Sequence, residues 1–105
     1  MKVLQSRSFA NKVKRFTKKQ KIIQDGEIRK IMDNPAIGQE KKGDMRGVYI
    51  HKFKIGMVQY LLSYRFNKDN LELIMIGPHE NYYRDLRSYS GGRKWQIQFL
   101  YWVCT

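Results

Sequence analysis

The sequence predicts an α+β fold: an N-terminal strand, a helical hairpin, and then a three-stranded antiparallel meander with the helices on one face. Three observations lead to it. Two segments near the N-terminus carry apolar residues at helical spacing, three later segments read as strands, and short turn-forming segments separate those strands. Strands followed so closely by their neighbours pair antiparallel, and an amphipathic hairpin of helices needs a sheet face to cover.

The predicted helices each follow a residue that can cap a first turn. After a short strand at residues 2–5, the side chain of Ser6 or Ser8 can accept a hydrogen bond from an unpaired backbone N–H of the first helix. Thr17 can cap the second helix, which we expect to end at Asn34-Pro35. The expected core stripes are Phe9, Val13 and Phe16 in the first helix, and Ile22, Ile23, Ile28, Ile31 and Met32 in the second.

A polar connector at residues 36–47 leads into predicted strands at 48–54, 57–66 and 71–76. Gly77-Pro78 is expected to stop the third strand, because proline cannot donate to a strand ladder. Alternation on the long middle strand predicts one face that covers the helices (Val58, Tyr60, Leu62, Tyr64, Phe66) and one that faces away from them (Gln59, Leu61, Ser63, Arg65). If Lys52 and Lys54 share the second face, the helix-free side is a cationic groove with His79 at its rim.

Charge limits the class of partner. The chain has 105 residues, 21 Lys and Arg against 9 Asp and Glu, and a net charge of +12. This excess favours an anionic partner: nucleic acid, an acidic protein or a membrane surface. No apolar run is long enough to cross a bilayer, no apolar signal core follows Met1, and Cys104 is the one cysteine. We therefore expect a cytoplasmic protein of one domain, without a disulfide and without a membrane partner.

The residues past the third strand suggest metal-free chemistry on RNA. Nucleotide-binding loops, zinc-protease and hydrolase motifs are absent, and carboxylates are scarce near the expected groove. Histidine transfers protons near neutral pH, clustered cations stabilise charge on phosphorus, and tyrosine stacks on bases. Each residue also has an ordinary role. His79 suits a turn, the lysines suit a solvated strand, Tyr82 and Tyr83 suit packing, and His51, of opposite parity, suits a structural contact.

Three segments carry a resemblance to the RelE/ParE superfamily of toxins from bacterial type II toxin–antitoxin systems. They are DNPAIGQEKKGDMRGVYIHKFKI at 33–55, QYLLSY at 59–64 and GPHENYYRDLR at 77–87. The resemblance covers residues 1–87 and implies a toxin domain there. Residues 88–105 are then a C-terminal extension. Its alternating stretch from Trp95 to Val103 fits a further strand, a segment docked on the groove, or a tail without a role of its own.

The resemblance implies a toxin held inactive by a cognate antitoxin. In the RelE branch the toxin enters the ribosomal A site and cuts messenger RNA without a metal or other cofactor. The positions that match imply catalytic roles for Lys52, Lys54 and His79, and Tyr83 matches an aromatic that some members have, so these four are the catalytic candidates. From residue type we expect RNA or phosphate contacts from Arg46, Arg65, Tyr82 and Arg84. Leu61 departs from the branch, which has arginine there, and Arg65 is a candidate replacement on the same face.

Two alternatives stay open. The ParE branch shares the fold, poisons DNA gyrase and lacks the nuclease groups. A plain basic nucleic-acid-binding module would also satisfy the charge. The presence of Lys52, Lys54 and His79 together favours the ribosome-dependent endoribonuclease, an mRNA interferase that inhibits translation.

Overall fold

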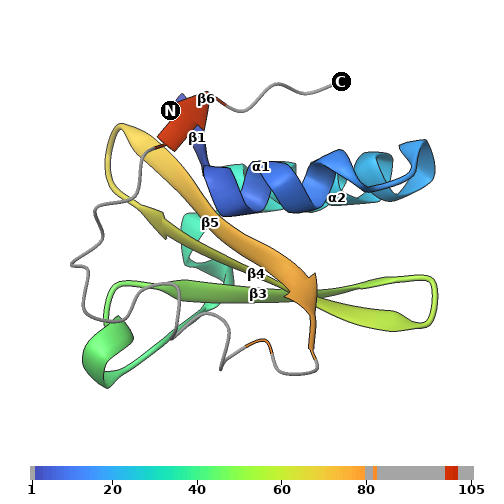
Figure 1. Ribbon diagram of the computed structural model, residues 1–105. Coiled ribbons are helices and arrows are strands. Elements are labelled where there is room, and N and C mark those ends of the chain that lie inside the picture. The colour runs from blue at the N-terminus through green and yellow to red at the C-terminus, as the bar shows by residue number, and fades with distance from the viewer. Residues whose placement is uncertain (1, 80–81, 83–98, 102–105) are drawn as a thin grey trace.

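The computed structural model describes residues 2–79, 82 and 99–101 of the chain. It confirms the α+β architecture: a strand, two helices, and then antiparallel strands in one twisted sheet. The strand order is β2-β3-β4-β5-β1-β6, and both helices lie together on one side of this sheet (Figure 1). We call the opposite side of the sheet the helix-free face.

Both helices begin directly after the predicted capping residues. Strand β1 (Lys2–Ser6) leads into α1 (Arg7–Lys14), and the Ser6 side chain accepts from the Phe9 backbone N–H at 3.0 Å. Thr17 and Gln20 form a reciprocal capping box at the start of α2 (Lys18–Asp33). None of the helices among the described residues has the length and apolar character needed to cross a membrane.

The sheet combines the predicted meander with a parallel pair. Strands β3 (Tyr49–Ile55), β4 (Val58–Phe66) and β5 (Asn70–Pro78) are antiparallel neighbours. Strand β1 pairs parallel with β5, with Val3 opposite Leu71, and places the N-terminus inside the sheet. Strand β5 carries a bulge at Ile74. Ser63 of β4 lies opposite Met75 and Tyr64 lies opposite Leu73, so Ile74 between them is an extra residue.

Several boundaries differ from the prediction. Strand β5 runs through Gly77-Pro78 instead of stopping at residue 76, because Pro78 occupies the last strand position, where a missing donor costs little. The polar connector contains short 3-10 helices η1 (Pro35–Ile37) and η2 (Gly43–Met45) and the two-residue strand β2 (Gln39–Glu40). In the extension, residues 99–101 form β6 (Phe99–Tyr101), which pairs antiparallel with β1.

Apolar clusters lie on both faces of the sheet. The larger one joins the helices to the sheet and includes Phe9, Ile28, Ile31 and Tyr64, all fully buried. The second lies on the helix-free face and consists of Met45, Val48, Ile50, Leu61, Ile74, Met75 and Tyr82. The expectation of a cationic groove along the whole helix-free face is therefore wrong. Its centre is apolar, and the basic side chains belong to its ends.

Candidate functional site

Lys52 and Lys54 lie on the helix-free face, as alternation along β3 predicted. Their partners on β4 share that face: Leu61 lies opposite Lys52, and Gln59 lies opposite Lys54. Phe53, between the two lysines, belongs to the core against the helices. Both lysines are exposed, and neither forms an ion pair with a carboxylate among the described residues. The two-residue turn after β3 holds Gly56 at φ 61°, which keeps the pair next to the tip of a tight hairpin.

A backbone contact brings His79 to the same end of this face. The His79 N–H donates to the Gln59 carbonyl oxygen at 3.0 Å, directly beyond the last β5 residue. Gln59 is the register partner of Lys54. Lys54, Gln59 and His79 therefore lie side by side on three neighbouring chain segments. Two strand spacings, about 10 Å, separate the backbones of Lys54 and His79. His79 is exposed.

Tyr82 anchors the segment that follows His79. Its hydroxyl donates to the Met75 carbonyl oxygen at 2.8 Å and lies 2.9 Å from Ser63 Oγ, and its N–H donates to the His79 carbonyl oxygen at 3.2 Å. The ring packs on Gly77, where a Cβ atom would lie 3.5 Å from Tyr82 Cδ2. Tyr82 is 3% exposed. The ring is therefore packed on the sheet, where it holds this segment, and its contact with RNA stays a prediction.

Arg65 lies on the helix-free face, but far from Lys52, Lys54 and His79. It lies six residues along β4 from Gln59, roughly 20 Å away along an extended strand. Buried Leu61 and Ser63 occupy the face between them. The Arg65 guanidinium pairs with Glu72 at 2.9 Å. The structure therefore does not bring Arg65 to the lysines, and it leaves Leu61 in the row between Lys52 and Gly77.

The remaining predicted residues are elsewhere or not described. Arg46 is exposed and follows η2, before β3 begins, at the end of that strand opposite Lys54. Tyr83 and Arg84 lie outside the described residues. The described part of the predicted site is thus one cluster, Lys52, Lys54 and His79, with Arg46 and Arg65 apart from it.

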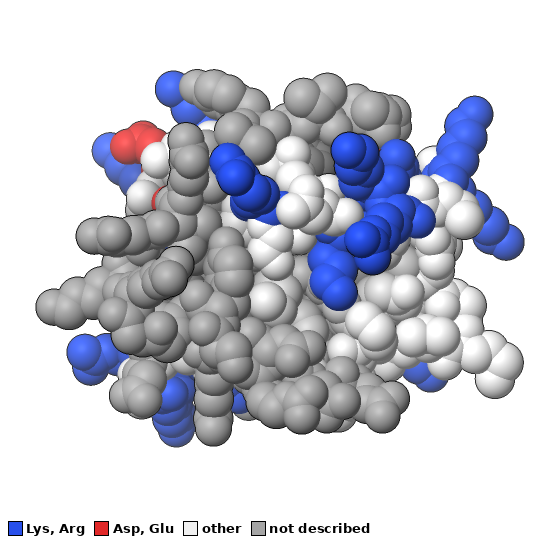
Figure 2. Space-filling model, viewed as in Figure 1, with Lys and Arg blue, Asp and Glu red and all other residues white. Residues whose placement is uncertain are grey.

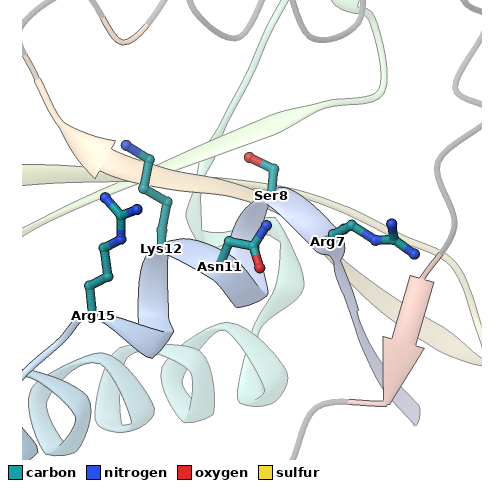
Figure 3. A pocket seen from close by; sticks show the side chains of 5 residues that line it. All are labelled: Arg7, Ser8, Asn11, Lys12 and Arg15. Atoms are coloured by element: carbon teal, nitrogen blue, oxygen red, sulfur yellow. The ribbon is translucent and has the colours of Figure 1, made fainter.

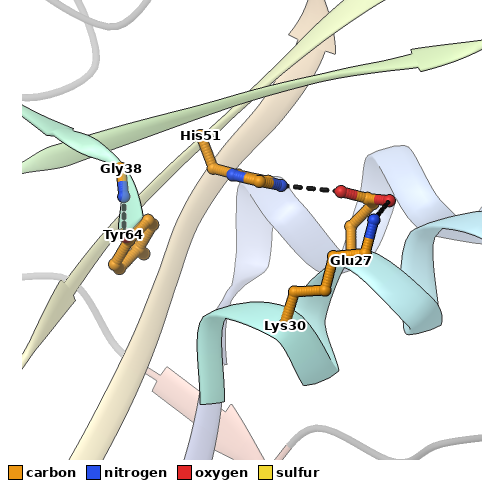
Figure 4. A network of polar contacts seen from close by, with 5 residues as sticks. All are labelled: Glu27, Lys30, Gly38, His51 and Tyr64. Atoms are coloured by element: carbon orange, nitrogen blue, oxygen red, sulfur yellow. Dashed lines mark hydrogen bonds and ion pairs between the residues drawn. The ribbon is translucent and has the colours of Figure 1, made fainter. Parts of the chain in front are cut away.

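His51 faces the helices, as its parity predicted, and makes a structural contact. Its Nε2 lies 2.7 Å from Glu27 Oε1 on α2, and the other oxygen of Glu27 accepts from Lys30 at 3.0 Å (Figure 4). Burial raises the pKa of Glu27, but the hydrogen bonds from His51 and Lys30 outweigh it and lower that pKa below its ordinary value. His51 therefore joins helix α2 to the sheet.

Sequence reasoning missed two supports of the cluster. Gln59 positions His79 through its backbone carbonyl, which any residue supplies, so no side-chain pattern announces it. Ser63 is a buried hydroxyl in an otherwise apolar row, and that polar interruption is a signal that could have pointed to a buried partner such as Tyr82. Together these contacts place Lys52, Lys54 and His79 at one end of the helix-free face. Such a set can bind a phosphate and transfer a proton.

Residues 3–87 match the family model of the ParE-like toxins of type II bacterial toxin–antitoxin systems. The match spans β1 through β5 and the segment that holds Tyr82, and it leaves β6 outside. No curated protein matches the chain at a significant level.

Proposed function

We propose, from the premise that this chain belongs to the ParE-like toxin family of type II toxin–antitoxin systems, that it inhibits translation as a ribosome-dependent, metal-free mRNA endonuclease. The family membership makes it a toxin and implies a cognate antitoxin as its partner. The nuclease activity and the ribosomal target are our inference from the residues at one end of the helix-free face.

The observation that supports the proposal is the row Lys54–Gln59–His79, with Lys52 one face position away. In RNA cleavage the 2′-oxygen forms a bond to phosphorus while the bond from phosphorus to the 5′-oxygen breaks. A general base takes the 2′-hydroxyl proton, and a general acid gives a proton to the departing 5′-oxygen. Cations nearby stabilise the additional negative charge that builds on the phosphate oxygens.

We assign these tasks by residue type. Imidazole exchanges protons near neutral pH, so His79 is the candidate acid or base. Lys52 and Lys54 supply positive charge to the phosphate, and a lysine crowded by other cations can also serve as a base. Tyr83 remains a proposed member of the set. About 10 Å between the Lys54 and His79 backbones leaves room for one phosphodiester between their side chains.

A ribosome-programmed cleavage assay with mapped cut sites tests the proposal. The double substitution Lys54→Ala and His79→Ala is expected to abolish both the cuts and the growth arrest on induction. Lys68→Ala is the matched control, because Lys68 is an exposed lysine in the turn at the other end of β4. Undiminished cleavage and toxicity by the double variant, with the control also active, would contradict the nuclease.

A second candidate function is inhibition of DNA gyrase without nuclease activity. The description of the matching family as ParE-like favours it, since the ParE branch acts on gyrase. The two candidates separate in one induction experiment. A nuclease stops translation first, whereas a gyrase poison induces the DNA-damage response while translation continues, and the double variant would then remain toxic.

A further inference from the structure

A second basic surface lies on the opposite side of the molecule from Lys52 and Lys54. A hollow of about 490 Å³ is lined by Arg7, Ser8, Asn11, Lys12 and Arg15, all on or next to α1. We call it the α1 hollow. Figure 2 shows Lys and Arg side chains gathered over the area where Figure 1 has α1. Since α1 packs on the helix-bearing side through fully buried Phe9, this surface faces away from the proposed nuclease site.

The positive charge of the α1 hollow is not neutralised within the described part of the chain. Arg7, Lys12 and Arg15 are exposed, and none of them pairs with a described carboxylate. The local sequence reinforces this, because eight Lys and Arg and no Asp or Glu occur in residues 1–24. Three cations around one concavity, without an ion-pair partner among the described residues, create a local positive potential that attracts an anion.

The arrangement of donors is linear. Ser8, Lys12 and Arg15 recur at i, i+4 and i+7, and Arg7 and Asn11 form a parallel row one position earlier. Figure 3 shows Ser8, Lys12 and Arg15 extending from α1 to the same side, with Arg7 at the far end. From Arg7 to Arg15 the helix advances about 12 Å, which matches roughly three phosphates along one strand of a duplex.

The residue types distinguish between polyanions. An acidic amphipathic helix would need apolar anchors at helical spacing, whereas the five described residues that line the α1 hollow carry polar or charged side chains. Arginine, lysine, serine and asparagine are the side chains that contact the phosphates of nucleic acids. We infer that the α1 hollow binds the sugar–phosphate backbone of a nucleic acid, independently of base sequence. This function goes beyond the proposed cleavage, because it uses neither Lys54 nor His79.

The test measures binding of the full-length protein to a 2′-O-methyl RNA hairpin by fluorescence anisotropy over a range of KCl concentrations. Because the blocked 2′-oxygen prevents cleavage, the result does not depend on nuclease activity. The variant Arg7→Gln, Lys12→Gln, Arg15→Gln should bind on the order of tenfold more weakly at physiological salt. The slope of log affinity against log salt should shrink by about two to three, one for each lost phosphate contact.

Two further variants keep the outcome interpretable. Lys19→Gln, Lys42→Gln, Lys68→Gln removes the same charge from exposed positions outside the α1 hollow and should retain the wild-type slope. Arg7→Lys, Arg15→Lys preserves the charge and should retain most of the affinity. Equal losses in both triple variants would overturn the inference in favour of a net-charge effect. Unchanged RNA binding together with lost binding to polyglutamate would overturn it in favour of an acidic protein partner.

Discussion

The imidazole of His51 and the carboxylate of Glu27 meet at 2.7 Å, and this contact joins β3 to α2 across the core. Glu27 is ionised at neutral pH and its pKa is lowered below the ordinary value, so its carboxylate accepts and Nε2 of His51 donates. The His51 side chain is 10% exposed, whereas the second partner of Glu27, Lys30, is 62% exposed. The inner contact therefore carries more of the interaction than the outer one.

Removing the Glu27 charge should cost stability in a pH-dependent way. Glu27→Gln is expected to lower the free energy of unfolding at neutral pH by about 1–3 kcal/mol, whereas Lys30→Gln should cost less than about 0.5 kcal/mol. A carboxyl whose folded pKa lies below its unfolded value stabilises the fold above the ordinary value of 4.5 and loses that contribution as the pH falls through the folded pKa. Urea unfolding at several pH values checks this. A wild-type advantage that stays constant into the acid range would contradict it.

Gly38 should not tolerate a side chain, whereas Gly26 should. A Cβ atom on Gly38 would lie 2.6 Å from Tyr64 Oη and 2.9 Å from the Ile50 carbonyl oxygen, and Tyr64 is fully buried. Gly38→Ala is expected to destabilise the fold by about 1–3 kcal/mol. A Cβ on Gly26 meets nothing within 4 Å, so Gly26→Ala in α2 should stabilise it by about 0.5–1 kcal/mol. Thermal unfolding measures both variants, and a shift of the two melting temperatures in the same direction would refute this pair of predictions.

The buried amide of Gln24 should be replaceable with a gain in stability. Gln24 lies on the core stripe of α2 with Ile28 and Ile31, and within the described part of the structure neither of its side-chain polar atoms has a hydrogen-bond partner. Gln24→Met removes the desolvated groups at similar volume and should raise the free energy of unfolding by about 1–3 kcal/mol. Exposed Gln39→Met is the control and should change it by less than about 0.5 kcal/mol. A loss of stability in Gln24→Met would show that the amide is satisfied in solution.

The Tyr82 hydroxyl should matter for both stability and cleavage. Tyr82→Phe removes the contacts to Met75 and Ser63 and should cost about 1–3 kcal/mol in unfolding free energy. If the proposed nuclease holds, kcat should fall more than KM changes, because the segment after His79 loosens while the phosphate-binding lysines stay. Tyr49→Phe, which removes an exposed hydrogen bond from the Tyr49 hydroxyl to Glu40 at the other end of β3, should leave cleavage unchanged. Equal kcat and KM values in the two variants would show that the Tyr82 hydroxyl does not contribute to cleavage.

Much of the fold and part of the site were predictable, because they depend on local patterns. Ser6 and Thr17 fix the helix starts through hydrogen bonds within a few residues, and alternation fixes the face of Lys52, Lys54 and His51. Arg65 shows the limit of that reasoning. Alternation gave its face correctly, but not its pairing with Glu72 or its distance from the lysines.

The amino-acid sequence by itself determined the order of the elements, the two faces of the strands and the strong positive charge, since each follows from residue type and spacing along the chain. Only the tertiary structure decided that β1 pairs parallel with β5, that Ile74 bulges, and that Tyr82 is buried beneath the segment that carries His79. It also decided that β6 pairs with the outer edge of β1. The physical reason is the same in each case. Partners distant in sequence are selected by backbone hydrogen bonding and packing in three dimensions, which no local periodicity encodes.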